Sequence, residues 1–179
     1  ITSMIGQAEH DENSQCILIS KDLKLIKEFQ KKIKEKIKKL PRRSIAFKSL
    51  KNNGLAILAK KNSDIVNSIN EIAPEHLEIN ISNPGKLIDK IINVGSVCIG
   101  KYSPMAVTDY NAGTNHVLPT FGSAKFASGL NVNEFYKKIS YITLSKKGVE
   151  KIGESATNLA EYEELFGHAL SIRSRMRRK

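Results

Sequence analysis

Four short runs of apolar or alternating residues constrain the fold of this chain more than any other feature. They span residues 16–20, 54–59, 77–81 and 96–100. The segments between them place apolar residues at steps of three and four, the period of a helix that buries one face. This succession of strands and helices predicts a mostly parallel sheet covered by helices, with right-handed crossovers. We therefore expect an α/β fold with a Rossmann-like parallel sheet and flanking helices.

Proline and serine residues set the expected helix boundaries. The first helix ends by Pro41, because proline cannot continue a helix. The second begins at Ser63, whose hydroxyl can cap it, and stops before Pro74. The third opens at Pro84, since proline suits the first helical position.

The pattern changes after Thr120, where Gly, Ser and Ala become frequent. We place a boundary near Leu130, which gives a main domain of residues 1–130 and a small, mainly helical domain of residues 131–179. The second part is expected to hold a short helix near Glu134, a strand over residues 141–145 and a long helical tract. About fifty residues are too few for a robust core, so this tail should pack on the main domain or on a second subunit. Residues 173–179 are basic and are expected to fray.

The charge of the chain is concentrated in one segment. Residues 21–51 hold thirteen Lys and Arg against three acidic residues, or +10 of the total net charge of +11. One hypothesis is a nucleic-acid-binding module. The alternative, which we favour, is a solvated helix face, because the face that carries the lysines has no interleaved aromatic residues for base stacking. The buried stripe of that helix would comprise Ile26, Phe29, Ile33, Ile37 and Leu40.

Composition narrows the class of protein further. No run of eighteen apolar residues occurs, so no membrane span is expected. Cys16 and Cys98 lie inside apolar runs, which is typical of small buried side chains in a reduced, cytoplasmic setting. No signal peptide is visible, and a chain that opens on Ile1 looks like the middle of a gene product.

A polar stretch, residues 108–120, has neither helical nor alternating periodicity. Glycine and asparagine suit tight turns, and functional groups often gather on such loops. Taken alone, the stretch is equally well a surface loop. Its functional side chains are Asp109, Asn111, Asn115 and His116, with Gly113 between them.

Four motifs together carry a family resemblance. They are Gln-Ala-Glu-His at residues 7–10, Ala-Pro-Glu-His-Leu at 73–77, Gly-Thr-Asn-His-Val-Leu-Pro-Thr at 113–120, and Glu163 followed by His168. Each is weak alone, but in this order and spacing the chain resembles histidinol dehydrogenase from its first residue to its last. The resemblance covers the C-terminal part of that enzyme. It implies that residues 1–130 are the C-terminal half of an incomplete Rossmann-like catalytic domain. It also implies that residues 131–179 are a small domain that dimerises and completes the active site.

Two imidazoles, a carboxylate and an amide suggest a metal site. His10, Asp109 and His168 are a usual set for a divalent metal, and Gln7 shares a helix face with His10 if both are helical. Scattered over 160 positions, these residues are equally well surface side chains. The resemblance implies that all four match the family's zinc ligands, with one Zn²⁺ per subunit and the substrate's imidazole and amine completing the coordination.

Glu75 and His76 form an adjacent carboxylate and imidazole. Without context they are a helix-end pair, but such groups suit general acid–base chemistry. The resemblance implies oxidation of L-histidinol through the aldehyde to L-histidine with two NAD⁺. It assigns alcohol deprotonation to His76 and water activation to Glu75. It also implies that His116 and Glu163 contact substrate, as do His76 and the four zinc ligands.

The nicotinamide site is not visible in the sequence. No G-x-G-x-x-G follows an expected strand. In the family the NAD-contacting residues lie N-terminal to the position of Gln7, so the chain alone is expected to be inactive. The family's C-terminal segment reaches across a two-fold axis, which implies a homodimer with shared active sites. No specific nucleic acid or membrane partner is expected, although a non-catalytic metal-binding remnant of the family remains an alternative.

Overall fold

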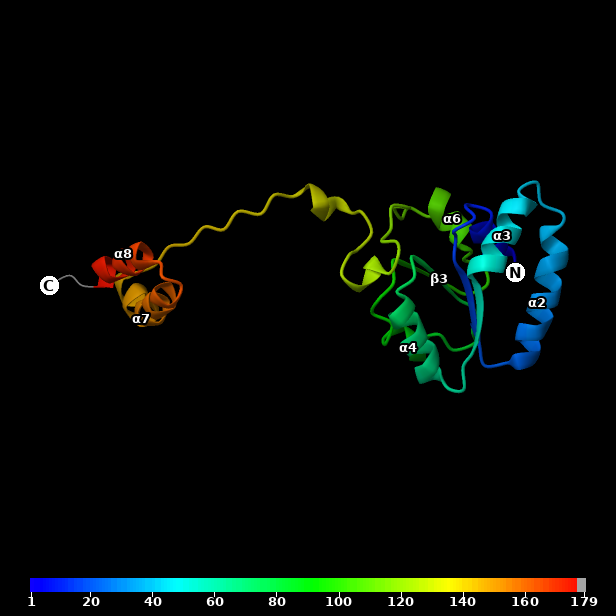
Figure 1. The fold of residues 1–179 in the computed structure, drawn as a ribbon, viewed down its shortest axis with the longest axis horizontal. Coiled ribbons are helices and arrows are strands. Elements are labelled where there is room, and N and C mark those ends of the chain that lie inside the picture. Colours follow the sequence, from blue (N-terminus) through cyan, green and yellow to red (C-terminus); the bar gives the residue numbers. More distant parts are fainter. Residues whose placement is uncertain (177–179) are drawn as a thin grey trace. The chain divides into compact units, whose positions relative to one another are not determined.

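The computed structural model describes residues 1–176 and divides the chain into two units (Figure 1). The first unit is Ile1–Phe135 and the second is Tyr136–Lys179. The division falls a few residues after the boundary expected near Leu130. The roles given to the two domains, a catalytic half and a dimerisation tail, stay predictions.

All four predicted strands form in the first unit, and they pair in parallel. Strand β1 (Cys16–Ser20) pairs with β2 (Gly54–Leu58), and β3 (His76–Ile79) pairs with β4 (Ser96–Ile99). Each pair is joined through a helical crossover, as a parallel connection requires. The α/β class is therefore confirmed, but within the described residues the strands form two two-stranded sheets rather than one.

The basic segment begins with the expected amphipathic helix, α2 (Leu23–Ile37). Asp22 caps it, because its carboxylate accepts hydrogen bonds from the backbone N–H groups of Lys24 and Leu25 at 2.8 and 3.3 Å. Its lysines are exposed, while the predicted stripe faces inward. The stripe joins the core of the unit, in which Ile5, Ala8, Cys16, Ile33, Ile37 and Ala46 are buried and Phe29 and Leu40 pack against them.

Two helices that flank this core were not predicted. Helix α1 (Thr2–Ala8) carries Gln7, and α3 (Arg43–Asn53) follows the turn after α2. Helix α3 contacts α1, α2 and both strands of the first sheet. It buries Ala46 and Ser49, which are too small and too polar to produce an apolar stripe in the sequence.

The predicted start of α4 (Asn62–Ile72) at Ser63 was wrong. The carboxylate of Asp64 instead accepts hydrogen bonds from the backbone N–H groups of Lys60 and Lys61, both at 3.1 Å, and so satisfies donors at the helix start. The helix ends before Pro74 as expected, and α5 (Gly85–Ile88) begins after Pro84 as expected.

The expected loop after β4 contains a short helix, α6 (Met105–Tyr110). Asp109 therefore lies on a helix, which corrects the expectation of a loop position. Two single-turn 3₁₀ helices follow, η1 (Ser123–Lys125) and η2 (Val132–Phe135). The short helix expected near Glu134 is η2.

The second unit is a pair of helices, α7 (Lys146–Tyr162) and α8 (Phe166–Met176), which pack on each other. The Ser145 hydroxyl caps α7 by accepting from Gly148 N at 3.1 Å. The expected strand over residues 141–145 was wrong, because this segment is extended with exposed side chains and pairs with no described strand. Fraying was expected from Arg173, yet α8 continues to Met176; residues 177–179 lie outside the described residues.

Candidate functional site

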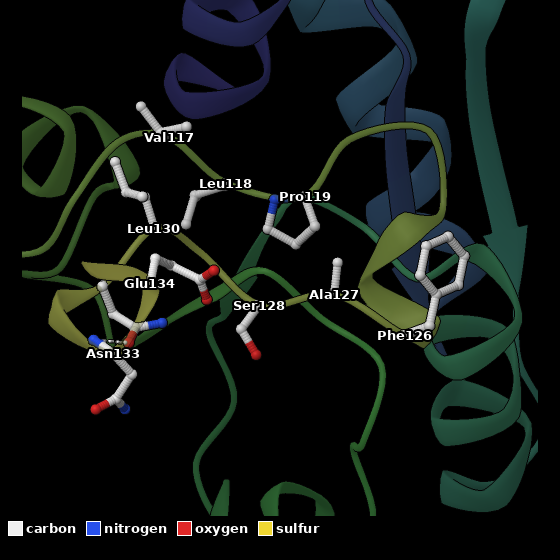
Figure 2. Close-up of a pocket in the computed structure, with 10 residues that line it drawn as sticks. Val117, Leu118, Pro119, Phe126, Ala127, Ser128, Leu130, Asn133 and Glu134 are labelled. Atoms are coloured by element: carbon white, nitrogen blue, oxygen red, sulfur yellow. Dashed lines mark hydrogen bonds between the residues drawn. The ribbon is translucent and has the colours of Figure 1, made fainter. Parts of the chain in front are cut away.

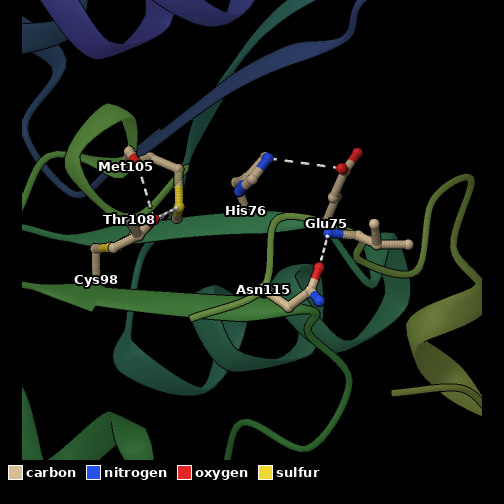
Figure 3. Close-up of polar contacts among 7 residues, drawn as sticks. Glu75, His76, Cys98, Met105, Thr108 and Asn115 are labelled. Atoms are coloured by element: carbon tan, nitrogen blue, oxygen red, sulfur yellow. Dashed lines mark hydrogen bonds and ion pairs between the residues drawn. The ribbon is translucent and has the colours of Figure 1, made fainter. Parts of the chain in front are cut away.

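The carboxylate of Glu75 and the imidazole of His76 face each other at the start of β3 (Figure 3). His76 Nε2 lies 3.6 Å from Glu75 Oε1, and the two side chains are 18% and 31% exposed. That distance is too long for a hydrogen bond, so Nε2 makes none with Glu75. The other ring nitrogen, Nδ1, is buried and has no hydrogen-bond partner among the described residues. The pair is half-shielded from water yet still open on one side.

A close backbone contact fixes this pair. Ser96 N donates to the Glu75 carbonyl and Gly95 N donates to the Pro74 carbonyl, both at 2.9 Å. A Cβ atom at Gly95 would lie 2.6 Å from the Glu75 carbonyl oxygen, a contact that real Cβ atoms do not make. Glycine at residue 95 therefore permits the approach of two segments that holds the acid–imidazole pair in place.

Gln7 and His10 lie at the end of α1 and in the turn after it. Gln7 is half-buried, whereas His10 is exposed. His10 N donates to the Gln7 carbonyl at 3.3 Å, so the two residues share one turn.

Residues on α3 and just before it bind the loop that follows His10. Arg42 donates to the His10 carbonyl at 3.2 Å, and Lys48 pairs with Glu12 at 2.7 Å. The Ser49 hydroxyl donates to the Ser14 carbonyl at 2.8 Å. The basic segment, whose role was open from the sequence, thus includes two cations that hold this loop.

Asp109 is brought towards both sets of residues by α6. This helix contacts α1, which carries Gln7, and β3, which begins at His76. The Asp109 side chain is half-buried. His116 lies six residues after the end of α6 and is exposed. Three elements that carry predicted site residues are therefore in contact within the first unit.

The remaining predicted residues belong to the second unit. Glu163 follows α7 directly and His168 lies on α8, and both are exposed. Within residues 1–176 no group of three His, Cys, Asp or Glu side chains stands ready to hold a metal ion. The first unit contributes Gln7, His10 and Asp109 to the predicted set, and the second contributes His168. The zinc assignment therefore stays a prediction.

Residues between Val117 and Glu134 line an open cavity of about 570 Å³ (Figure 2). None of the predicted zinc ligands lines it, and Glu134 is its ionisable side chain. No site was predicted here, where the Gly-, Ser- and Ala-rich composition after residue 120 was used only to place the expected domain boundary. Its apolar walls come from Val117, Leu118, Pro119, Phe126 and Leu130.

Both cysteines are buried, as predicted. Burial raises the pKa of the Cys16 thiol to about 11, although a hydrogen bond with Ser49 lowers it in part. Burial also raises the pKa of Cys98, whose Sγ lies 3.8 Å from Met105 Sδ. Neither thiol is therefore a ready nucleophile. Among the described residues, no helix is both long and apolar enough to cross a membrane.

Comparison with known proteins agrees with the motifs. The family model for histidinol dehydrogenase matches residues 1–176. The chain is 56% identical to a histidinol dehydrogenase of Pelagibacter ubique, over 99% of this chain and 42% of the relative. It is 45% identical to one of Methanocaldococcus jannaschii, over 97% of this chain and 40% of the relative. The crystal structure of histidinol dehydrogenase from Elizabethkingia anophelis superposes with a TM-score of 0.83 and 36% identity, covering 98% of this chain and 40% of that one.

The fold and these matches define an α/β chain of the dehydrogenase class. The chain belongs to the histidinol dehydrogenase family. It spans about 40% of the length of the relatives that it matches. The assignment of that share to the C-terminal part stays a prediction. The family assignment does not favour the nucleic-acid-binding alternative.

Proposed function

We propose that the chain forms part of an enzyme that oxidises L-histidinol through its aldehyde to L-histidine with two NAD⁺. The observation that carries this proposal is the half-buried Glu75–His76 pair, with Nε2 and Oε1 3.6 Å apart. Two such groups, side by side and still open to solvent, suit a reaction with two different proton transfers. Membership of the histidinol dehydrogenase family supports the choice of substrate.

His76 serves the first oxidation as general base. Its Nε2 atom takes the hydroxyl proton, because Nδ1 is buried and inaccessible to substrate. This role requires the neutral tautomer with its proton on Nδ1. The carbon-bound hydrogen leaves as hydride to NAD⁺, which yields the aldehyde and NADH. The nearby Glu75 carboxylate stabilises the imidazolium that forms.

Glu75 serves the second oxidation. Its carboxylate takes a proton from a water molecule as that water adds to the aldehyde carbon. The resulting hydrate loses a hydroxyl proton to solvent and its carbon-bound hydrogen as the second hydride to a second NAD⁺, which yields L-histidine and NADH. The Glu75 side chain is 31% exposed, so its carboxylate can contact water. The buried Nδ1 of His76 cannot.

The residues proposed to hold zinc fit that ion in donor chemistry. Imidazole nitrogen and carboxylate oxygen are common zinc donors, and the amide oxygen of Gln7 is a rarer one. When bound, one zinc ion per subunit would orient the substrate and polarise its oxygen. Gln7 and Asp109 lie on α1 and α6, and the contact between these helices supports placing both residues in one site.

His168 and Glu163 extend the proposal to a second subunit. They lie in a two-helix unit that is small for an independent domain and exposes apolar side chains such as Leu159, Phe166 and Leu170. We propose that this unit packs in a homodimer and that His168 completes the partner's zinc site. Glu163, together with His116, would contact the substrate. The family's biosynthetic role is consistent with action in the cytoplasm.

Zinc content tests the proposal directly. We expect about one zinc per subunit for the chain reconstituted with zinc and freed of excess, as a single catalytic site would hold. His10→Ala and Asp109→Asn should lose it, whereas His116→Ala, a matched histidine outside the predicted ligands, should retain it. Equal zinc in all four proteins would refute the assignment.

Activity is tested in a longer protein that joins this chain to the remaining length of its relatives. NADH formation from L-histidinol is the expected result. Zinc binding without any NADH formation in that protein would instead support a non-catalytic remnant.

No observation on the exposed lysine face of α2 favours a nucleic-acid role.

A further inference from the structure

Glu78 is hydrogen-bonded to the first residue of α6, and the proposed reaction assigns no role to it. It lies two residues after His76 on β3, so both side chains leave the same face of the strand. Glu78 Oε1 accepts a hydrogen bond from the backbone N–H of Met105 at 2.8 Å. Met105 is the first residue of α6, and this N–H has no partner within the helix.

A helix as short as α6 depends on such contacts. Isolated helices shorter than about 12 residues are marginal in water, and α6 has six. Within the helix, the Thr108 hydroxyl donates to the Met105 carbonyl at 2.7 Å, and the Met105 sulfur lies 3.8 Å from Cys98 Sγ on β4 (Figure 3). The bond from Glu78 is charge-assisted, and such bonds are roughly twice as strong as neutral ones.

Asp109 lies on the helix whose first residue is bonded to Glu78. It lies four residues after Met105, so the two side chains share a face of α6. Met105 is buried and directs that face inward, towards β4. A helix released at its first residue would carry the Asp109 carboxylate away from α1 and from Gln7.

We propose that Glu78 is a positioning residue for Asp109. Its carboxylate fixes the start of α6 against β3 and thereby sets the place of the Asp109 carboxylate relative to α1. The inference rests on the proposed zinc site but does not make Glu78 a ligand. It links the strand that begins with the acid–base histidine to the helix that supplies a metal ligand.

Two measurements on the 179-residue chain test this role. The first is amide hydrogen exchange at Met105 in zinc-free protein, and the second is zinc affinity by competition with a chromophoric chelator. Glu78→Ala should speed exchange roughly tenfold to hundredfold, as expected for the loss of a bond to a charged group. Zinc affinity should fall by up to the same factor. Glu78→Gln keeps an acceptor oxygen, so it should fall between Glu78→Ala and wild type in both measurements.

Glu71→Ala is the matched control, because Glu71 is an exposed carboxylate on α4 that pairs with Lys125 at 3.5 Å. It should leave both measurements unchanged. Unchanged Met105 exchange in Glu78→Ala would overturn the anchoring role. Faster exchange with undiminished zinc affinity would overturn the positioning role alone. If Glu78→Ala does not fold, the test rests on the same two measurements in Glu78→Gln. Met105 exchange and zinc affinity equal to those of wild type in that variant would overturn the proposal.

The zinc assignment fails separately. Equal zinc affinity in wild type and Asp109→Asn would overturn the proposed ligand set, and with it any effect of Glu78 on zinc. The exchange measurement would still report on α6 in that case, because it is made without metal. Failure of the proposed function and failure of the inference therefore give different results.

Discussion

Ser49 offers the clearest test of how α3 supports the site. Its side chain is 0% exposed, and its hydroxyl donates to the Ser14 carbonyl at 2.8 Å, in the loop that follows His10. Ser49→Ala removes one oxygen and leaves almost no cavity, so the lost hydrogen bond dominates. A buried group left without its partner costs about 1–3 kcal/mol. Ser14 is half-buried, so water can reach its carbonyl, and we expect the lower half of that range.

This cost is measurable by thermal unfolding. For a unit of this size, each kcal/mol lowers Tm by roughly 4 °C. Ser44→Ala is the control, because Ser44 lies on the same helix but is exposed. That variant should change the free energy of unfolding by less than about 0.5 kcal/mol. Unfolding is monitored by circular dichroism. Equal Tm values for the two variants would show that the Ser49 bond does not stabilise the fold.

Three further predictions follow from the site and the core. In the longer active protein, Glu75→Gln should slow aldehyde oxidation far more than alcohol oxidation, and His76→Asn should slow the alcohol step by ~10² to 10⁴-fold; equal small effects on both half-reactions would contradict these roles. Mixing inactive His76→Asn and His168→Ala proteins with subunit exchange should restore part of the activity, whereas no recovery despite proven exchange would rule out shared sites. Because the pKa of Cys16 is raised from 9.0 to about 11, the unfolded chain loses this proton first, so the free energy of unfolding should fall between pH 9 and 11. Cys16→Ala should lack that part of the fall, and identical pH profiles would refute it.

The strands and α2 were predictable because their signals are local. A run such as residues 16–20 or a stripe such as Ile26 and Ile33 needs no knowledge of distant residues. Helix α3 was missed because it buries Ala46 and Ser49, which leave no apolar period in the sequence. The strand expected over residues 141–145 fits the β pattern but has no partner strand among the described residues, and pattern alone cannot supply one.

Long-range contacts explain what remained hidden at the site. Asp109 was expected on a loop, because the bond from Glu78 that starts α6 spans 27 positions of sequence. The one signal for Glu78 was an acidic residue inside a short strand. The adjacency of Glu75 and His76 was visible directly, whereas the close approach of Gly95 that fixes it appears only in three dimensions.

The exposed apolar strand residues have a consequence for colloidal behaviour. Leu55 and Leu58 on β2 and Ile99 on β4 are each about half exposed, and both sheets end in open edges among the described residues. Such edges invite strand pairing between molecules. The net charge of +11 opposes that encounter through mutual repulsion, which salt screens. The lysines of α2 contribute to this charge, so they oppose edge-to-edge strand pairing between copies of the chain in dilute buffer. Such pairing should increase as ionic strength rises.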